Sequence, residues 1–189
     1  MFLNPTDFSF TQALEANWRI VLSELNALSM NSFMAFPERH LYTRQGETDE
    51  RRMVGKGWDV FGLYAFGREM KRNCRLCPET ARLVRAIPDM TTAGFSRMEP
   101  GTHIKPHEGY SSAVLRCHLG LITPDACALR VGSQVKGWEA GKCLVFDDTT
   151  EHEAWNRSGS VRVVLLIDFK KPGATFEVAD FITSRIPEN

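Results

Sequence analysis

A succession of short β-rich runs fills the second half of the chain, and this pattern constrains the fold more than any other feature of the sequence. The runs lie at residues 94–98, 112–122, 128–131, 142–146 and 162–169. Turn-forming residues separate them, among them Pro100-Gly101, Pro124-Asp125, Gly132-Ser133 and Ser158-Gly159. Many short strands at close spacing are typical of a β-sandwich or barrel. The sequence therefore predicts a mainly β core of the jelly-roll class.

The first half of the chain carries helical patterns instead. Apolar residues recur at helical spacing between Thr11 and Leu28, which predicts an amphipathic helix. A second helix is predicted from Pro78 to Ile87, because proline is favoured in a first helical turn and Pro88 follows the end. Residues 58–66 alternate as a strand does, and the polar stretch 43–52 is predicted to be a mobile loop at the rim of a cleft.

The length and the charge balance limit the organisation and the partners of the chain. Its 189 residues suit one domain, which we divide into a helical and first-strand annex (1–92), a β core (93–172) and a C-terminal tail (173–189). Lys plus Arg and Asp plus Glu each number 23, so the chain has no global field to attract nucleic acid.

The sequence also carries no sign of a membrane segment or a secretory leader. No apolar run approaches the roughly 20 residues that cross a bilayer, and the N-terminus lacks a basic region followed by an apolar stretch. Five cysteines, an odd number, suit reduced thiols better than a disulfide framework. A cytoplasmic protein without a membrane span is expected.

Four of the five histidines lie in the β half, at His103, His107, His118 and His152. Neutral imidazole is a common ligand for first-row metals. His107 and His152 each stand at the end of a predicted strand, so that they are able to converge at one mouth of a small barrel. The alternative for each histidine is an ordinary surface or hydrogen-bonded side chain.

Arg162 opens the apolar run 163–167, which has the composition of a buried strand. A guanidinium inside a barrel requires a carboxylate partner, which it binds through two parallel hydrogen bonds. No acidic residue of the β core is an obvious partner, whereas a small dicarboxylate ligand would serve. The alternative is an arginine at a strand edge whose head group reaches water.

Several ordered blocks of the sequence resemble the aspartyl/asparaginyl β-hydroxylase family. The similarity runs from about Trp58 to Pro172, and the blocks that carry it are Met98 to Gly109, Leu115 to Leu121, Trp138 to Lys142, and Phe146 to Trp155. The resemblance implies a double-stranded β-helix (jelly-roll, cupin-like) core with flanking N-terminal helices. It also implies an enzyme that uses Fe(II), 2-oxoglutarate and O2.

By this resemblance the metal is held by two histidines, His107 and His152. Most 2-oxoglutarate oxygenases add a carboxylate two residues after the first histidine, but Gly109 stands there in this chain. The family shares this gap, which water is thought to fill. Asp148 is interpreted as a group that orients this water or a ligand histidine, and the alternative is plain turn chemistry.

The resemblance further assigns the co-substrate pocket. Arg162 and Ser96 match the residues that bind the distal carboxylate of 2-oxoglutarate, and Arg116 and His118 match positions that contact 2-oxoglutarate or substrate. The animal peptide hydroxylases carry an arginine where this chain has Val114. We therefore expect a weaker or rebuilt clamp on a substrate carboxylate.

The predicted function is radical hydroxylation of an aspartyl or asparaginyl residue, or of a related small substrate, with release of succinate and CO2. The partner is then a peptide, an amino acid or another small molecule. The alternative from another class is a non-catalytic jelly-roll module that binds a metal and a ligand. Cys74 and Cys77 form a Cys-x-x-Cys step, which alone is a weak signal for metal binding or redox chemistry.

Overall fold

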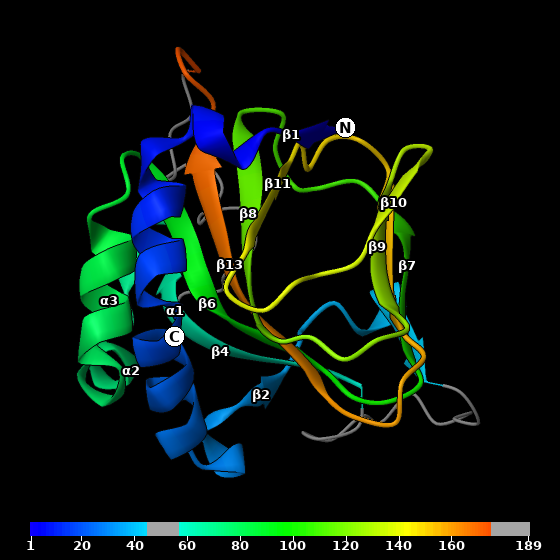
Figure 1. The fold of residues 1–189 in the computed structure, drawn as a ribbon, viewed down its shortest axis with the longest axis horizontal. Coiled ribbons are helices and arrows are strands. Elements are labelled where there is room, and N and C mark those ends of the chain that lie inside the picture. Colours follow the sequence, from blue (N-terminus) through cyan, green and yellow to red (C-terminus); the bar gives the residue numbers. More distant parts are fainter. Residues whose placement is uncertain (45–56, 175–189) are drawn as a thin grey trace.

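Two antiparallel sheets pack face to face, and helices cover the outer face of the larger one (Figure 1). The structure is a computed structural model that describes residues 1–44 and 57–174. The larger sheet has the order β1-β11-β8-β13-β6-β4-β2, with β5 paired to β4. The smaller sheet has the order β10-β9-β12-β7-β3. This arrangement confirms the prediction of a mainly β, jelly-roll core preceded by helices.

The bounds of the elements are as follows. The larger sheet contains β1 (Phe2–Leu3), β2 (Met34–Ala35), β4 (Trp58–Ala65), β5 (Arg68–Glu69), β6 (Met90–Met98), β8 (Val114–Ile122), β11 (Cys143–Phe146) and β13 (Arg162–Lys170). The smaller sheet contains β3 (Tyr42–Arg44), β7 (Thr102–His107), β9 (Cys127–Val131), β10 (Gln134–Lys136) and β12 (His152–Asn156). The helices are α1 (Ser9–Ala27), α2 (Lys71–Leu76) and α3 (Pro78–Arg85), with short 3₁₀ turns η1 (Pro5–Asp7), η2 (Met30–Ser32) and η3 (Arg39–Leu41).

The two predicted helices are present with nearly the predicted bounds. The apolar stripe of α1 buries Leu14, Val21 and Leu25 against the larger sheet. Glu24 of α1 accepts hydrogen bonds from the backbone N–H groups of Glu79 and Thr80, and so satisfies the free donors at the N-terminus of α3. Short strands without an apolar run were missed, β7 and β12 among them. Most of the predicted loop 43–52 lies outside the described residues.

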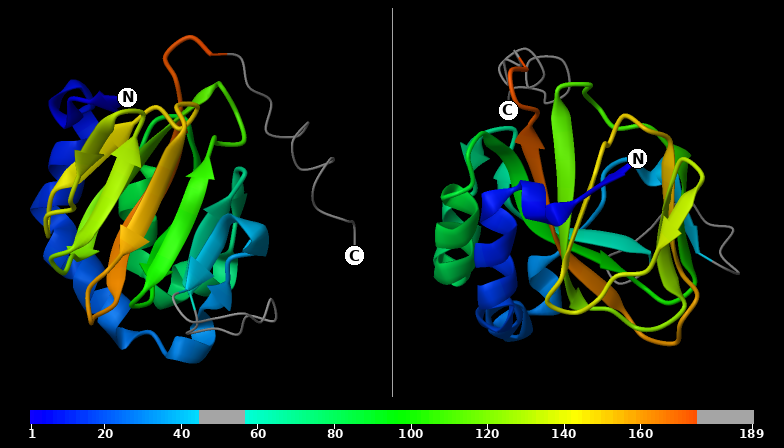
Figure 2. Two further views of the ribbon diagram at one scale, coloured as in Figure 1. Left: turned by 90° about the vertical axis from the view of Figure 1, so that its right-hand side faces the viewer. Right: turned by 45° about the horizontal axis from the view of Figure 1, so that its top comes forward.

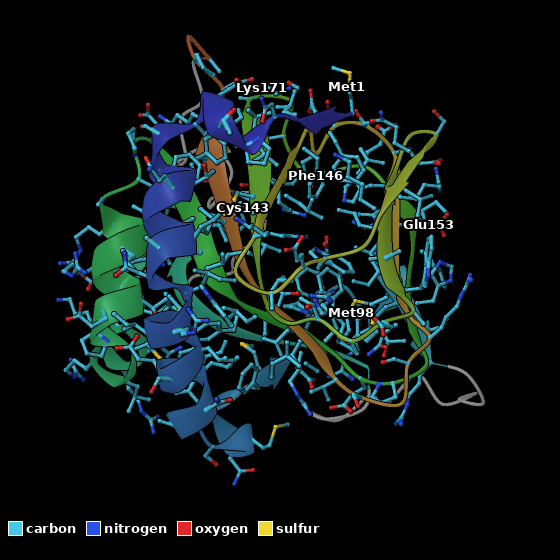
Figure 3. All side chains as sticks on the ribbon, in the orientation of Figure 1. Met1, Met98, Cys143, Phe146, Glu153 and Lys171 are labelled. Carbon is cyan, nitrogen blue, oxygen red and sulfur yellow. The ribbon has the colours of Figure 1, made fainter. Side chains whose placement is uncertain are left out.

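The central strand β13 separates two apolar cores. Its odd-numbered residues from Val163 to Phe169 face α1 and α3, whereas Val164 faces the smaller sheet. Successive side chains of a strand point to opposite faces, so a strand that is covered on both sides reads as one apolar run. The second core lies between the sheets and includes Met98 and Phe146, as Figure 3 shows. Figure 2 shows the smaller sheet on the side of the molecule opposite the helices.

The annex and the β core are joined through shared sheets. Strand β6 begins at Met90, so it runs across the division that the sequence placed between residues 92 and 93. Strands β1 and β4, from the N-terminal half, pair with β11 and β6. In the described ranges 1–44 and 57–174, no helix has the length and apolarity to span a bilayer. The cytoplasmic location stays a prediction.

The cysteines are buried free thiols. All five, including Cys74 and Cys77, lack a disulfide. Burial raises the pKa of Cys77 to about 12, which leaves its thiol protonated and poorly reactive at neutral pH. A buried structural position therefore accounts for the Cys-x-x-Cys step.

Candidate metal centre and co-substrate pocket

Strands β7 and β12 bring His107 and His152 together. The two strands are antiparallel neighbours, and these two residues are direct cross-strand partners. Their ring centroids lie 4.2 Å apart with an angle of 54° between the ring planes. The expected convergence of two histidines 45 positions apart in the chain is therefore present.

The main chain of each strand end fixes the tautomer of its histidine. The Nδ1 atom of His107 lies 2.7 Å from the carbonyl oxygen of Lys105, and that of His152 lies 2.9 Å from the carbonyl oxygen of Thr150. A carbonyl oxygen only accepts, so each Nδ1 carries the proton and donates. Each Nε2 is thereby left with a lone pair, which is the usual arrangement of histidines that bind a metal.

An oxygen of Asp148 and the Nε2 atom of His152, both hydrogen-bond acceptors, face each other. Burial, together with the neighbouring His107 and Arg116, lowers the pKa of His152 to about 3, so its ring is neutral and its Nε2 presents a lone pair. Asp148 Oδ1 lies 3.3 Å from this nitrogen, and both side chains are buried. Arg116 Nη1 lies 2.8 Å from the same Asp148 oxygen, whereas the Nε2 atom of His152 has no hydrogen-bond partner among the described residues. The donor set therefore fits a metal ion or a metal-bound water.

Gly109 is required because Asp148 fills the space that a side chain would need. A Cβ atom on Gly109 would lie 1.7 Å from Asp148 Oδ2 and 2.9 Å from the Asp148 carbonyl oxygen. The backbone N–H of Gly109 donates to that carbonyl at 2.7 Å, so the two segments are held in close contact. A third protein ligand at position 109 is therefore sterically excluded. Among the described residues, no group of three His, Cys, Asp or Glu side chains is arranged to hold a metal.

Arg162 lies inside the barrel, as the first of its two alternatives predicts. Its side chain is 1% exposed, and its Nη1 donates to the carbonyl oxygen of Ser96 at 3.0 Å. Within residues 1–44 and 57–174 it forms no ion pair with a carboxylate, and its Nε has no hydrogen-bond partner. Burial lowers the pKa of its guanidinium. The cation is thus ready for an anionic ligand that the fold itself does not supply.

Ser96 lies next to Arg162 and also has a donor to offer. Its hydroxyl oxygen accepts a hydrogen bond of 2.9 Å from the indole N–H of Trp58, so the hydroxyl proton is free to turn toward a ligand. Trp58 is held in place by Phe36, whose ring stacks on it at 3.7 Å. Residues from both sheets line a cavity of about 20 Å³ at this point, and they include Ser96, His107, Arg116, His118, His152 and Arg162. A dicarboxylate therefore requires these side chains to separate as it enters.

His118 is the third polar group of the pocket, and it is neutral. Burial is the main cause that holds the pKa of His118 well below its ordinary value, and the charges of Arg162 and Arg116 act in the same direction. Its Nδ1 accepts a hydrogen bond of 3.3 Å from the indole N–H of Trp138. Its Nε2 is buried and has no partner among the described residues.

Arg116 is already neutralised by two carboxylates, which the sequence did not suggest. Its Nε and Nη2 donate to the two oxygens of Asp168 at 2.7 and 2.9 Å, and Asp148 Oδ1 lies 2.8 Å from its Nη1. Asp168 follows Arg162 at an even spacing on β13, so strand alternation places both on the inner face. That spacing was a signal that could have identified Asp168. In this state Arg116 lines the pocket but offers little free charge to a ligand.

His103, four residues before His107, lies on the outer face of the smaller sheet. Its Nε2 is 2.7 Å from Glu153 Oε2, and Figure 3 places Glu153 on this sheet, away from the helices. His103 is therefore separate from the candidate site.

A family model described as Aspartyl/Asparaginyl beta-hydroxylase matches residues 15–172. The chain is similar to an ornithine lipid ester-linked acyl 2-hydroxylase of Rhizobium tropici, with 40% identity over 87% of this chain and 58% of the relative. It is also similar to the aspartyl/asparaginyl beta-hydroxylase of Homo sapiens, with 32% identity over 90% of this chain and 23% of the relative. The chain thus spans little more than half, or less, of these curated relatives.

Among solved structures, the chain is similar to an oxidoreductase of the 2OG-Fe(II) oxygenase family from Burkholderia pseudomallei. The alignment covers 60% of this chain and 68% of the oxidoreductase chain. The TM-score is 0.46 and the identity 14%. The two antiparallel sheets of the chain itself define its fold.

Proposed function

The chain belongs to the aspartyl/asparaginyl β-hydroxylase family, and we propose that it is an Fe(II)- and 2-oxoglutarate-dependent hydroxylase. The single observation that carries the proposal is that a candidate metal site and a candidate anion site lie in one pocket between the sheets. Two tautomer-fixed imidazoles face a buried carboxylate, and a buried arginine without a carboxylate partner in the described residues lies in the same pocket. A metal ion accounts for the first group and a dicarboxylate for the second.

In this proposal His107 and His152 hold the ferrous ion through their Nε2 atoms. When bound, iron would supply the activation of O2, and the overall reaction converts 2-oxoglutarate, O2 and the substrate to succinate, CO2 and the hydroxylated substrate, with one oxygen atom in succinate and one in the product. Asp148, whose Oδ1 lies 3.3 Å from His152 Nε2, would orient a water beside a bound ion, since position 109 carries no side chain that could act as a ligand. Arg162 and the Ser96 hydroxyl bind one carboxylate of the co-substrate, and His118 donates to another of its oxygens. The protein thereby fixes the coordination and excludes bulk water.

The reaction shared by the named relatives indicates the type of carbon that is oxidised. The β-carbon of an aspartyl residue and carbon 2 of an acyl chain are both methylene groups next to a carbonyl carbon. The names of the relatives therefore describe one bond change on two substrates. We propose that this chain hydroxylates a methylene group adjacent to a carbonyl.

Between these two substrates, the pocket favours an uncharged acyl chain. Arg116 is balanced by Asp148 and Asp168 and has little charge left for a substrate carboxylate. Val114, on the same face of β8 two residues earlier, is apolar and fully buried. A substrate with an anionic side chain would lose its hydration in the pocket, where Arg116 is already paired and Arg162 is assigned to 2-oxoglutarate. This observation supports an acyl substrate over an aspartyl residue, which is one of the substrates that the sequence analysis predicts.

The test is turnover by the anaerobically iron-loaded protein with two substrates, an aspartyl peptide and an ester-linked acyl lipid in micelles. Succinate release and the mass gain of one oxygen atom are measured together. We expect both with the acyl lipid. Product from the peptide alone would contradict the acyl preference and leave the hydroxylase proposal intact. A protein that binds Fe(II) and 2-oxoglutarate but never forms succinate would instead be the non-catalytic binding module.

A further inference from the structure

Trp138 contacts two of the polar groups that the proposed function assigns to the co-substrate. It lies in the loop between β10 and β11 and is 8% exposed. Its indole N–H donates to His118 Nδ1 at 3.3 Å, and the guanidinium carbon of Arg162 lies 4.5 Å from the centre of its ring. One side chain from a loop thus touches residues of two different strands, β8 and β13.

The loop that carries Trp138 is held firmly against the sheet. The backbone N–H of Gly120 donates to the carbonyl oxygen of Lys142, and that of Gly141 donates to the carbonyl oxygen of Gly120. A Cβ atom on Gly120 would lie 2.3 Å from the carbonyl oxygen of Glu139. From the other side, Glu15 of α1 accepts from the backbone N–H of Cys143. The indole is therefore in position before any ligand arrives.

The hydrogen bond from Trp138 determines the tautomer of His118. An indole N–H is a donor only, so His118 Nδ1 has to be the unprotonated nitrogen. In a neutral ring the proton then resides on Nε2, the atom that is buried without a partner in the described part of the chain. With the opposite tautomer, this atom would present a lone pair to the pocket and would repel a carboxylate oxygen.

The contact with Arg162 stabilises a cation without using its hydrogen-bond donors. A guanidinium over an indole ring is attracted by the electrons of the ring face. A carboxylate at the same place would neutralise the charge and occupy the N–H groups, as Asp168 does for Arg116. Arg162 therefore keeps its charge for a ligand and, apart from the hydrogen bond from Nη1 to the Ser96 carbonyl, its donors as well.

We propose that Trp138 is a positioning residue that fixes His118 as an Nε2–H donor and holds Arg162 as an unneutralised cation. The part of the pocket formed by the larger sheet, with Arg162, Ser96 and His118, then offers hydrogen-bond donors to a ligand. Such a pocket selects a ligand that only accepts, such as a carboxylate, over a carboxamide or an alcohol. The identification of that ligand as 2-oxoglutarate rests on the proposed function, whereas the tautomer does not.

The first test reads the tautomer in the metal-free, unmodified protein. Nitrogen-15 NMR of the histidine side chains distinguishes protonated from unprotonated ring nitrogens, and His118→Asn assigns the resonances. We expect His118 to carry its proton on Nε2 only. A proton on Nδ1 in the unmodified protein would overturn the proposal, and this reading needs no Trp138 variant that folds.

The second test compares variants of Trp138. Trp138→Phe keeps a ring face for Arg162 but loses the N–H, so both tautomers of His118 should appear. The dissociation constant for 2-oxoglutarate, measured by calorimetry on Mn(II)-loaded protein, should rise about three- to tenfold, the value of one hydrogen bond. Trp138→Leu also loses the ring face, and its affinity should fall further.

Trp155→Phe is the matched control. Trp155 stacks on Arg157 at 4.8 Å, outside the pocket, so its replacement should leave both the His118 tautomer and the affinity unchanged. Unchanged affinity and a single tautomer in Trp138→Phe would refute the positioning role. If the unmodified protein has the expected tautomer but does not bind 2-oxoglutarate, the proposed function fails and the assignment of His118 by Trp138 stands.

Discussion

The two sheets contribute different parts of the site and orient them in different ways. The smaller sheet carries the histidine pair, and each ring is fixed by a carbonyl two residues earlier on its own chain segment. The larger sheet carries Ser96, His118 and Arg162, which we propose bind the co-substrate, and each of them contacts a tryptophan from another segment of the chain. The proposed metal ligands are thus arranged by local backbone, whereas the proposed co-substrate pocket depends on tertiary contacts.

This difference predicts where the protein tolerates change. A histidine that is fixed by its own strand end is insensitive to distant substitutions as long as β7 and β12 stay paired. The anion site is sensitive to side chains several elements away, because its donors are set by indole rings. Substitutions in the two sheets should therefore have different effects.

The largest effect is expected in the smaller sheet, from His152→Ala. Removal of one of the two proposed imidazole ligands should lower succinate formation by more than about 100-fold and abolish tight Fe(II) binding, because the proposed site has only these two protein ligands among the described residues. The control is His103→Ala, which changes a histidine of β7 on the outer face and should keep activity. Equal losses in the two variants would show that the effect comes from the sheet and not from the metal site.

In the larger sheet, Arg162→Met should have opposite effects on binding and on stability. Loss of the charged donors should weaken 2-oxoglutarate binding by about 100-fold or more. The metal-free variant should nevertheless unfold at a higher temperature, because a buried cation without a carboxylate partner in the described residues is replaced by an apolar side chain. Calorimetry measures the affinity for 2-oxoglutarate, and thermal unfolding measures the change in stability. A variant that is destabilised and still binds 2-oxoglutarate fully would contradict the proposed role of Arg162.

Substitution of Gly109 tests the packing beside the proposed metal site without changing either proposed metal ligand. Gly109→Ala should destabilise the protein by about 1–3 kcal/mol, since its Cβ would lie 1.7 Å from Asp148 Oδ2. The second substitution Asp148→Gly should recover much of this loss. Gly159→Ala is the control, because no atom of the described residues lies within 4 Å of a Cβ at that position. Equal denaturant midpoints for Gly109→Ala and Gly159→Ala would contradict the crowding.

The smallest expected effect is the pH dependence of stability that His118 of the larger sheet causes. Burial, with the charges of Arg162 and Arg116, keeps the pKa of His118 well below 6.5 in the folded protein, so the unfolded chain binds a proton that the folded chain does not. The stability from His118 is therefore present above pH 6.5 and is lost as the pH falls below it. The free energy of unfolding should decrease by on the order of 1 kcal/mol between pH 7.5 and 5.5. His118→Gln should reduce this dependence in denaturant titrations, and an unchanged slope would argue against a buried neutral ring.

Much of the fold was predictable because the long elements have strong local patterns. The helix α1 and the strands β4, β8 and β13 carry continuous or periodic apolar residues, and these were found within a few residues. Strands β7 and β12 were not predicted. They are short, they are held mainly by pairing with each other and with β9 and β3, and their sequences are polar. Pairing energy between distant segments leaves no local pattern to detect.

The sequence by itself determined the residue types of the site: two histidines, an arginine at the start of an apolar strand and a glycine where a carboxylate would stand. Only the tertiary structure decided what each group is free to do. Arg116 and Arg162 are the same residue type on neighbouring strands. One is neutralised by Asp148 and Asp168, and the other stacks on Trp138 and keeps its charge. That difference comes from side chains that meet across the barrel, because the protonation and the availability of a buried group depend on its neighbours in space.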